Sequence, residues 1–180
     1  MIIRLIIIYI ILFNFTLVQA DSTGSDTGYK LPRYVSLKSD NVNLRIGSST
    51  NYPIKLKYIK KNLPVEIIDE NENWRKTIDF EGNIGWIHKS LIKGDRYALI
   101  KDTNEMEGVY NKPKGKIIGE IGKHNIVRVK ICIEKWCLIN INKTKGWINK
   151  EKLWGVYLNE RFNVPFYQPL INQLWKLDFF

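Results

Sequence analysis

Alternating hydrophobic and polar residues, the pattern typical of β-strands, run through the middle of the chain. Val65 and Ile67, and later Val127, Val129 and Ile131, are separated by single charged residues. A period of two places such side chains on one face of a strand, whereas a helix needs a period of about 3.6 residues. Short runs of this kind, divided by turns rich in Gly, Asn, Asp and Lys, predict an all-β fold of small barrels or sandwiches.

One set of motifs occurs twice along the chain, at a spacing of about 62 residues. The matching segments are an alternating strand, a tryptophan and a Gly-Trp-Ile strand: residues 63–67 with 125–129, Trp74 with Trp136, and residues 85–89 with 146–150. A repeat of this length indicates two copies of one small unit. We therefore expect two tandem small barrels, the first over residues 34–93 and the second over residues 98–157.

The two cysteines lie in one predicted hairpin of the second copy. If Cys132 faces Cys137 across the turn at Glu134-Lys135, the two lie close enough to form a disulfide. Glu70 and Arg75, which have opposite charges, stand at the matching positions of the first copy. The sequence therefore predicts that one cross-strand position is joined by a disulfide in one copy and by an ion pair in the other.

The same register predicts which side chains face the core. The cysteines would lie on the face opposite to Val129, and Glu70 on the face opposite to Ile67. Neither hairpin has a strong two-residue turn dipeptide, so a register shifted by one residue stays open. A redox role for the cysteines is the other alternative, although their Cys-x4-Cys spacing and the lack of a helix N-terminus do not favour a lowered thiol pKa.

The first 20 residues have the pattern of a secretory signal peptide. Arg4 precedes an apolar stretch from Leu5 to Phe13, and Val18-Gln19-Ala20 fits a signal-peptidase site. The alternative is a retained membrane anchor facing the periplasm, for which the apolar run is short because a span needs about 20 residues. We expect an exported, periplasmic protein, in whose oxidising compartment a disulfide is favoured. Residues 21–33, rich in Ser, Thr, Gly and Asp, are expected to form a flexible leader.

Composition and charge exclude several classes of protein. The 180 residues are 44% hydrophobic, which excludes a disordered chain, and contain only 2 Cys and 2 His, which leaves little room for a metal site. We therefore expect no metal and no cofactor. The net charge of +10 would suit nucleic acid in a cytosolic protein, but an exported one meets anionic lipid or wall polymer instead. We expect no nucleic-acid partner.

The motifs, in their order and spacing, resemble those of the bacterial SH3-like domain family, and most closely the exported two-copy form of alphaproteobacteria. They are residues 41–45, 51–54, 63–68, 74–75 and 85–88 in the first copy, and Cys132, residues 136–137, 146–148 and 153–157 in the second. The resemblance covers residues 34–157. It implies barrels of five to six strands that bind rather than catalyse, with cell-wall peptide or an envelope protein as the partner.

The resemblance also implies an aromatic groove that holds extended or proline-rich segments. Tyr52 and Tyr58 stand next to turns and Trp86 lies in the Gly-Trp-Ile strand, so we expect these three to contact the ligand. Tyr110 is the nearest counterpart in the second copy. The first copy is the expected binder, because the second lacks the Asn-Leu-Arg element of residues 43–45. Packing in the barrel cores is the alternative for the repeated tryptophans.

The tail over residues 158–180 has no counterpart in the resemblance. From Pro169 onward, apolar residues recur at helical spacing and predict a short amphipathic helix. This helix would pack across the barrels, or contact an anionic membrane surface or a protein. Two alternatives to peptide binding follow. One is an accessory scaffold of an envelope complex that docks through the tail, and the other is a small cell-wall hydrolase, for which the sequence shows no nucleophile-and-base arrangement.

Overall fold

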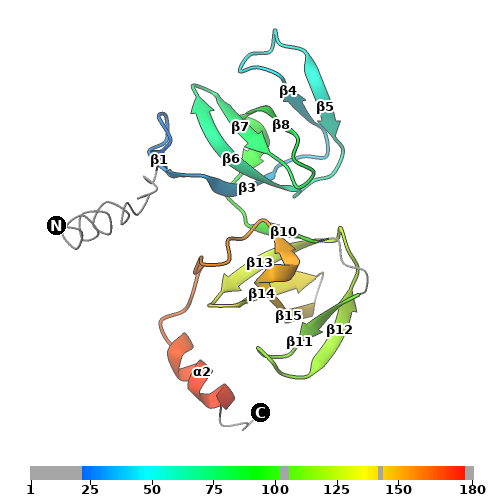
Figure 1. The fold of residues 1–180 in the computed structure, drawn as a ribbon, viewed down its shortest axis with the longest axis vertical. Coiled ribbons are helices and arrows are strands. Elements are labelled where there is room, and N and C mark those ends of the chain that lie inside the picture. The colour runs from blue at the N-terminus through cyan, green and yellow to red at the C-terminus, as the bar shows by residue number, and fades with distance from the viewer. Residues whose placement is uncertain (1–21, 102–105, 142–143, 177–180) are drawn as a thin grey trace, which may run out of the picture.

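A computed structural model describes residues 22–101, 106–141 and 144–176, and strands are their main secondary structure. Two seven-stranded antiparallel sheets follow one another along the chain, with a two-stranded sheet before them and helix α2 (Gln168–Lys176) after them (Figure 1). The predicted all-β fold with a short helical tail is confirmed. In the described part of the chain no helix is long and apolar enough to cross a membrane. The predicted signal peptide over residues 1–20 lies outside the described residues.

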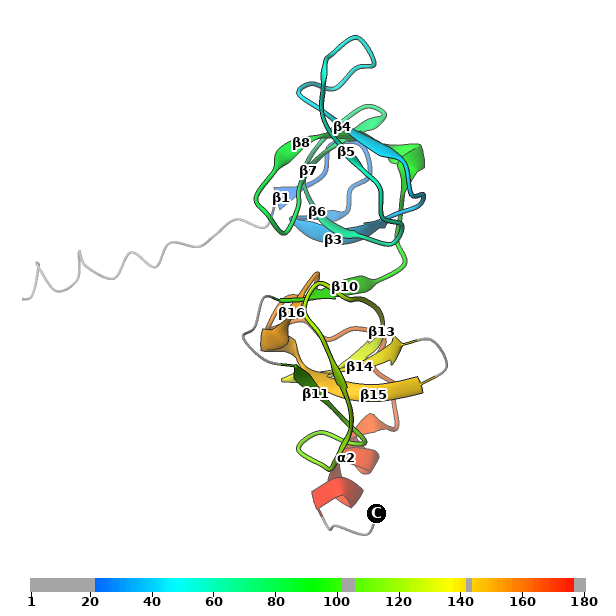
Figure 2. The same cartoon turned by 90° about the vertical axis from the view of Figure 1, so that its right-hand side faces the viewer.

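The first seven-stranded sheet curls into a ring (Figure 2). Aliphatic side chains form the core inside it. Leu37, Val42, Leu44, Val65 and Ile87 are fully buried inside it. Its strands, in the spatial order β5-β4-β8-β7-β6-β3-β9, are β5 (Ile54–Tyr58), β4 (Val42–Arg45), β8 (Ile84–His88), β7 (Trp74–Ile78), β6 (Pro64–Asn71), β3 (Arg33–Leu37) and β9 (Ile92–Lys93).

The second seven-stranded sheet repeats the first strand by strand, which confirms the duplication. The resemblance implied five to six strands for each barrel, and the seventh arises because the two-residue strands β9 and β16 extend the sheets beyond β3 and β10. The spatial order is β12-β11-β15-β14-β13-β10-β16, formed by β12 (Ile117–Ile121), β11 (Glu107–Tyr110), β15 (Thr144–Asn149), β14 (Trp136–Ile141), β13 (Ile126–Cys132), β10 (Tyr97–Ile100) and β16 (Leu153–Trp154).

A β-bulge in hairpin β13–β14 decides which side chains reach the core. Cys132 pairs with Cys137 as predicted, and a disulfide joins them. The register shifts between Val129 and Ile131, however, and one extra residue reverses the alternation beyond that point. Both cysteines are therefore fully buried on the same side as Val129, and the expectation that they face away from it was wrong.

Hairpin β6–β7 of the first barrel has a bulge at the same place, between Ile67 and Asp69. Glu70 and Arg75 again pair across the hairpin, and Arg75 Nε lies 3.4 Å from Glu70 Oε1, so the predicted ion pair is confirmed. Both side chains point inward and are 6% and 4% exposed. The expectation that they lie opposite to Ile67 was wrong, because the bulge brings them to its side.

The buried carboxylate of Glu70 organises the segment that precedes the first barrel. Strands β1 (Ser22–Thr23) and β2 (Lys30–Leu31) form a hairpin whose turn lies on this carboxylate. Thr27 donates its backbone N–H to Oε2 at 3.0 Å and its hydroxyl to Oε1 at 2.8 Å. A Cβ added to Gly24 would overlap the carboxylate, so the turn needs glycine there. This arrangement differs from the flexible leader expected over residues 21–33.

Hydrogen bonds set the pKa of Glu70. Burial by itself would raise it, but hydrogen bonds from Arg33 and Thr27, together with the charge of Arg33, lower it to about 2. The carboxylate is therefore ionised in the folded protein at neutral and mildly acidic pH.

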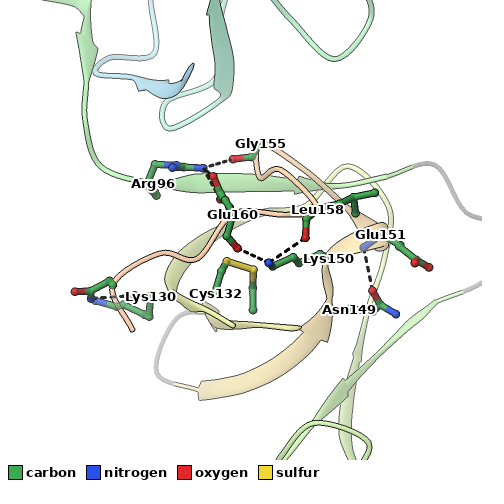
Figure 3. Close-up of a disulfide and its surroundings, with 11 residues drawn as sticks. Arg96, Lys130, Cys132, Asn149, Lys150, Glu151, Gly155, Leu158 and Glu160 are labelled. Atoms are coloured by element: carbon green, nitrogen blue, oxygen red, sulfur yellow. Dashed lines mark hydrogen bonds and ion pairs between the residues drawn. A yellow bond between two sulfur atoms is a disulfide. The ribbon is translucent and has the colours of Figure 1, made fainter. Parts of the chain in front are cut away.

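The C-terminal tail is anchored at the matching place on the second barrel (Figure 3). Phe162 forms an antiparallel bridge with Cys132, with N–H···O distances of 2.9 and 3.0 Å. The side chain of Lys150 is buried beside the disulfide, and its ammonium donates to the carbonyl oxygens of Leu158 and Glu160. Burial lowers the pKa of Lys150, and the charge of Glu160 opposes that shift.

The two barrels share an apolar contact. Leu99 of β10 belongs to the second sheet, yet it is 2% exposed and packs in the core of the first barrel. The ring of Tyr34 lies 5.1 Å from Trp154 and 4.7 Å from Tyr157. The Tyr157 hydroxyl donates to Glu66 Oε1 at 2.7 Å, which adds a polar contact at the edge.

We expect Glu70→Gln to destabilise the protein by about 3 kcal/mol at pH 7, because it removes the buried anion beside Arg75 and leaves this guanidinium only the partly exposed carboxylate of Asp26, 3.7 Å away. The pKa of Glu70 is lower in the folded chain than its usual value, so its contribution is complete above pH 4.5 and is lost as the pH falls toward 2. Urea unfolding of both proteins across this range measures the effect, and the two stabilities should converge in acid. Glu72→Gln, an exposed change in the same hairpin, is the control, and equal stability of all three proteins at pH 7 would contradict the role of Glu70.

Candidate functional site

A shallow groove of about 200 Å³ lies on the outer face of the first barrel. Alternation in β4, β7 and β8 points one set of side chains into the core and the other set outward into this groove. A loop over residues 46–53 and a short 3₁₀ helix (Lys89–Leu91) form its two sides. The lining residues are Asn43, Arg45, Thr50, Trp74, His88, Ser90 and Leu91.

Trp74 and His88 form the aromatic part of the groove. They face each other across β7 and β8, with ring centroids 5.3 Å apart at 83°. Nδ1 of His88 accepts the backbone N–H of Ser90 at 3.3 Å, which caps the 3₁₀ helix. Because Nδ1 is an acceptor, the neutral imidazole carries its proton on Nε2.

Arg45 supplies the charge of the groove. Its Nη1 donates to the carbonyl of Tyr52 at 2.6 Å, which holds the guanidinium against the loop. The loop itself is fixed from the other side, since Asn71 Nδ2 donates to Ser48 Oγ at 2.7 Å. None of the lining residues is a carboxylate, and within the described ranges Arg45 forms no ion pair.

The structure brings Tyr52 and Trp86 to the same arginine. Trp86 is half-buried on the outer face, directly opposite Arg45 in the strand register, while Tyr52 is 47% exposed and binds Arg45 through its carbonyl. Both lie at the border of the groove rather than among its lining residues.

Tyr58 lies elsewhere, because the last residue of β5 points inward. Its side chain is 7% exposed and its hydroxyl donates to Asp79 Oδ2 at 3.0 Å. Burial and the neighbouring Asp79 carboxylate raise its pKa. The expectation that a tyrosine next to a turn stays at the surface is therefore corrected.

The equivalent surface of the second barrel is filled by its own side chains. Tyr110 takes the place of Arg45, since it pairs with Trp147 as Arg45 pairs with Trp86. The Tyr110 ring packs against Trp136, the counterpart of Trp74, at 5.2 Å. Trp147 is 5% exposed and lies 5.4 Å from Trp175 of α2, so the helix packs on this face.

Sequence reasoning missed Arg45, Trp74 and His88 as neighbours. Their shared signal is strand parity, because each is an outward position next to a buried one: Leu44, Arg75 and Ile87. The sequence does not reveal the bulge in hairpin β6–β7. Without the bulge, the alternation assigns Trp74 to the core side, so strand parity alone does not identify it as a groove residue.

A second hollow, of about 360 Å³, lies between the barrels. Its apolar floor consists of Phe80, Leu99 and Trp154, and its polar rim consists of Glu81, Lys101 and His124. Over the described ranges no group of three or more His, Cys, Asp or Glu residues is placed to hold a metal ion.

The match to a known protein family agrees with the duplicated barrel. The family described as bacterial SH3 domain matches residues 38–94 and 109–155, more than half of the chain. No curated protein matches it. Two solved structures, NlpC2 and NlpC1 from Trichomonas vaginalis, are each 15% identical, with TM-scores of 0.31 and 0.29, over 70% and 73% of this chain. These matches cover 49% and 48% of the two structures, so the chain spans about half of their length.

We expect Tyr58→Phe to destabilise the protein by about 1 kcal/mol, since it removes a buried hydrogen bond to Asp79. Tyr52→Phe removes the same hydroxyl from an exposed ring and should leave stability unchanged. Urea unfolding of the two variants measures the difference. Equal stability of both would show that Tyr58 does not depend on its partner.

Proposed function

Because the chain belongs to the bacterial SH3 domain family, we propose that it is an exported, non-catalytic binding protein whose first barrel holds an extended cell-wall peptide in the groove at Trp74. Members of this family are binding modules, commonly of cell-wall peptidoglycan. The observation that carries the proposal is the open groove with an aromatic floor on the first barrel, where the second barrel is filled.

A groove of this shape suits an extended chain. The Trp74 ring offers a flat apolar surface, and Asn43 and Arg45 stand beside it with hydrogen-bond donors for peptide carbonyls. A segment that is already extended loses little conformational entropy when it binds. A shallow surface can therefore hold it without enclosing it.

The non-catalytic role rests on the chemistry of the groove. Both cysteines are buried in a disulfide and present no thiolate. Ser90 Oγ lies 2.8 Å from His88 Nδ1, but this nitrogen already accepts the Ser90 N–H as a helix cap. Asn149 caps the matching helix of the second barrel in the same way, accepting the Glu151 N–H at 3.0 Å. The His-Ser contact is thus explained by capping, and no carboxylate lines the groove to complete a triad.

A scaffold role through the tail is the second candidate, favoured by exposed apolar side chains before and on α2. Phe166 is 94% exposed, Leu170 60% and Tyr167 49%. Such a cluster is typical of a docking surface.

We expect Phe166→Ser with Leu170→Ser to abolish crosslinking to an envelope protein in intact cells. Ile59→Ser, at an apolar residue 79% exposed elsewhere, should leave the crosslink unchanged, and a crosslink that survives the double change would contradict docking through the tail.

The main proposal predicts that the protein sediments with purified peptidoglycan and that Trp74→Ala weakens this binding about tenfold or more, because buried aromatic contacts dominate such interfaces. Trp136→Ala removes the matching side chain from the second barrel and is the control, since that ring packs against Tyr110, which stands in the place of Arg45. Co-sedimentation at low salt over a range of peptidoglycan concentrations gives both affinities.

Two results would count against the proposal. One is wild-type protein that stays in the supernatant at low salt. The other is equal loss of binding in both tryptophan variants, which would indicate a general effect of barrel stability instead of a site on the first barrel.

A further inference from the structure

We infer that Arg45 makes the groove selective for peptides with a free carboxylate, which binds the guanidinium beside the Trp74 ring. This inference rests on the proposed peptide binding at the same groove.

The polar groups of the groove are mainly donors. Arg45 has five N–H bonds, and it donates one of them, from Nη1, to the Tyr52 carbonyl. His88 contributes its Nε2–H, since Nδ1 is used in capping. No carboxylate lines the groove, so an anionic ligand completes the pairing that the protein leaves open.

The guanidinium is held in place before any ligand binds. The bond to the Tyr52 carbonyl ties it to the loop, and the loop is closed by the bond from Ile46 N to Pro53 O at 3.2 Å. The Tyr52 ring packs so closely on Gly47 that a Cβ there would overlap it. A preorganised arginine loses less entropy when it binds a carboxylate, and its planar fork matches the two carboxylate oxygens.

The position of Arg45 in the sheet separates it from other charges. Trp86 lies between Arg45 on β4 and Lys76 on β7. Lys76 faces Asp69 in the register, so an anion of the protein already stands near that lysine. Arg45 has no such neighbour within the described pairings of β4, and its charge is directed to the groove.

The second barrel shows what the surface becomes without this arginine. Tyr110 replaces Arg45, and Asn149 replaces His88 in the same strand pairing with the tryptophan. Glu151, the counterpart of Ser90, adds a carboxylate of its own. One duplicated surface thus carries an anion-binding arginine in the first barrel and none in the second, so Arg45→Tyr gives the first barrel the residue of the second.

The test compares two synthetic stem peptides, L-Ala-γ-D-Glu-L-Lys-D-Ala with free carboxylates and the same peptide with both carboxylates amidated. Calorimetric titration of the wild-type protein should show about tenfold or more tighter binding of the acid form, as expected for a charge-assisted contact. Arg45→Tyr should bind both peptides equally weakly. Arg45→Lys keeps the charge but not the fork, and should retain part of the selectivity.

A matched control separates the site from the overall charge. Arg128→Tyr makes the same substitution at an exposed arginine of the second barrel, paired with Asp95 at 3.5 Å, and should keep full selectivity. Near-ultraviolet circular dichroism shows whether each variant is folded. Equal wild-type binding of the acid and the amide overturns the role of Arg45 while leaving peptide binding intact. Binding of neither peptide, with no retention on peptidoglycan, overturns both proposals.

Discussion

The inward-facing pair at the end of the central hairpin is the contact on which the rest of both barrels depends. A buried charge needs partners, so Glu70 is stable in the first barrel only with Arg75 inside and Thr27 and Arg33 around it. The disulfide at the same place in the second barrel needs no counter-charge. It leaves the backbone of Cys132 to pair with Phe162. The same position thus fixes a terminal segment in each barrel: the hairpin before the first barrel binds Glu70, and the tail after the second pairs with Cys132.

This difference separates the roles of the two copies. Because the tail is anchored beside the disulfide, α2 lies where Trp175 reaches Trp147, and the outer face of the second barrel is covered. The first barrel is closed by a segment that precedes it, and its matching face around Trp86 stays open with Arg45 at its centre. One copy has become a support for the tail, while the other has kept a surface that suits a ligand.

The sequence was sufficient for the repeat, the strands and both cross-strand pairs, because periodicity and hairpin spacing are local properties. It was insufficient to predict which face of the central hairpins is buried, because a single bulge residue reverses the inward and outward positions in the rest of its strand. Neither bulge is marked by a glycine. The hairpin before the first barrel could not be predicted either, since it forms around a Glu70 that points inward only after the bulge. At the site, Tyr52 and Trp86 lie next to the groove. The sequence predicted Tyr58 at the surface and Trp74 on the core side of its strand, whereas Tyr58 is buried and Trp74 lines the groove.

Leu99 links the stability of the first barrel to the folding of the second. This side chain is part of the second sheet in sequence and of the first core in space, so the first core is complete only when both halves are folded. Tyr34 and Trp154 extend the shared contact. Separate barrels on a linker unfold independently, whereas a core that includes a side chain of the neighbouring sheet loses part of its packing when that sheet unfolds. The stability of the first barrel therefore depends on a strand of the second, and a change that displaces β10 removes packing from both cores.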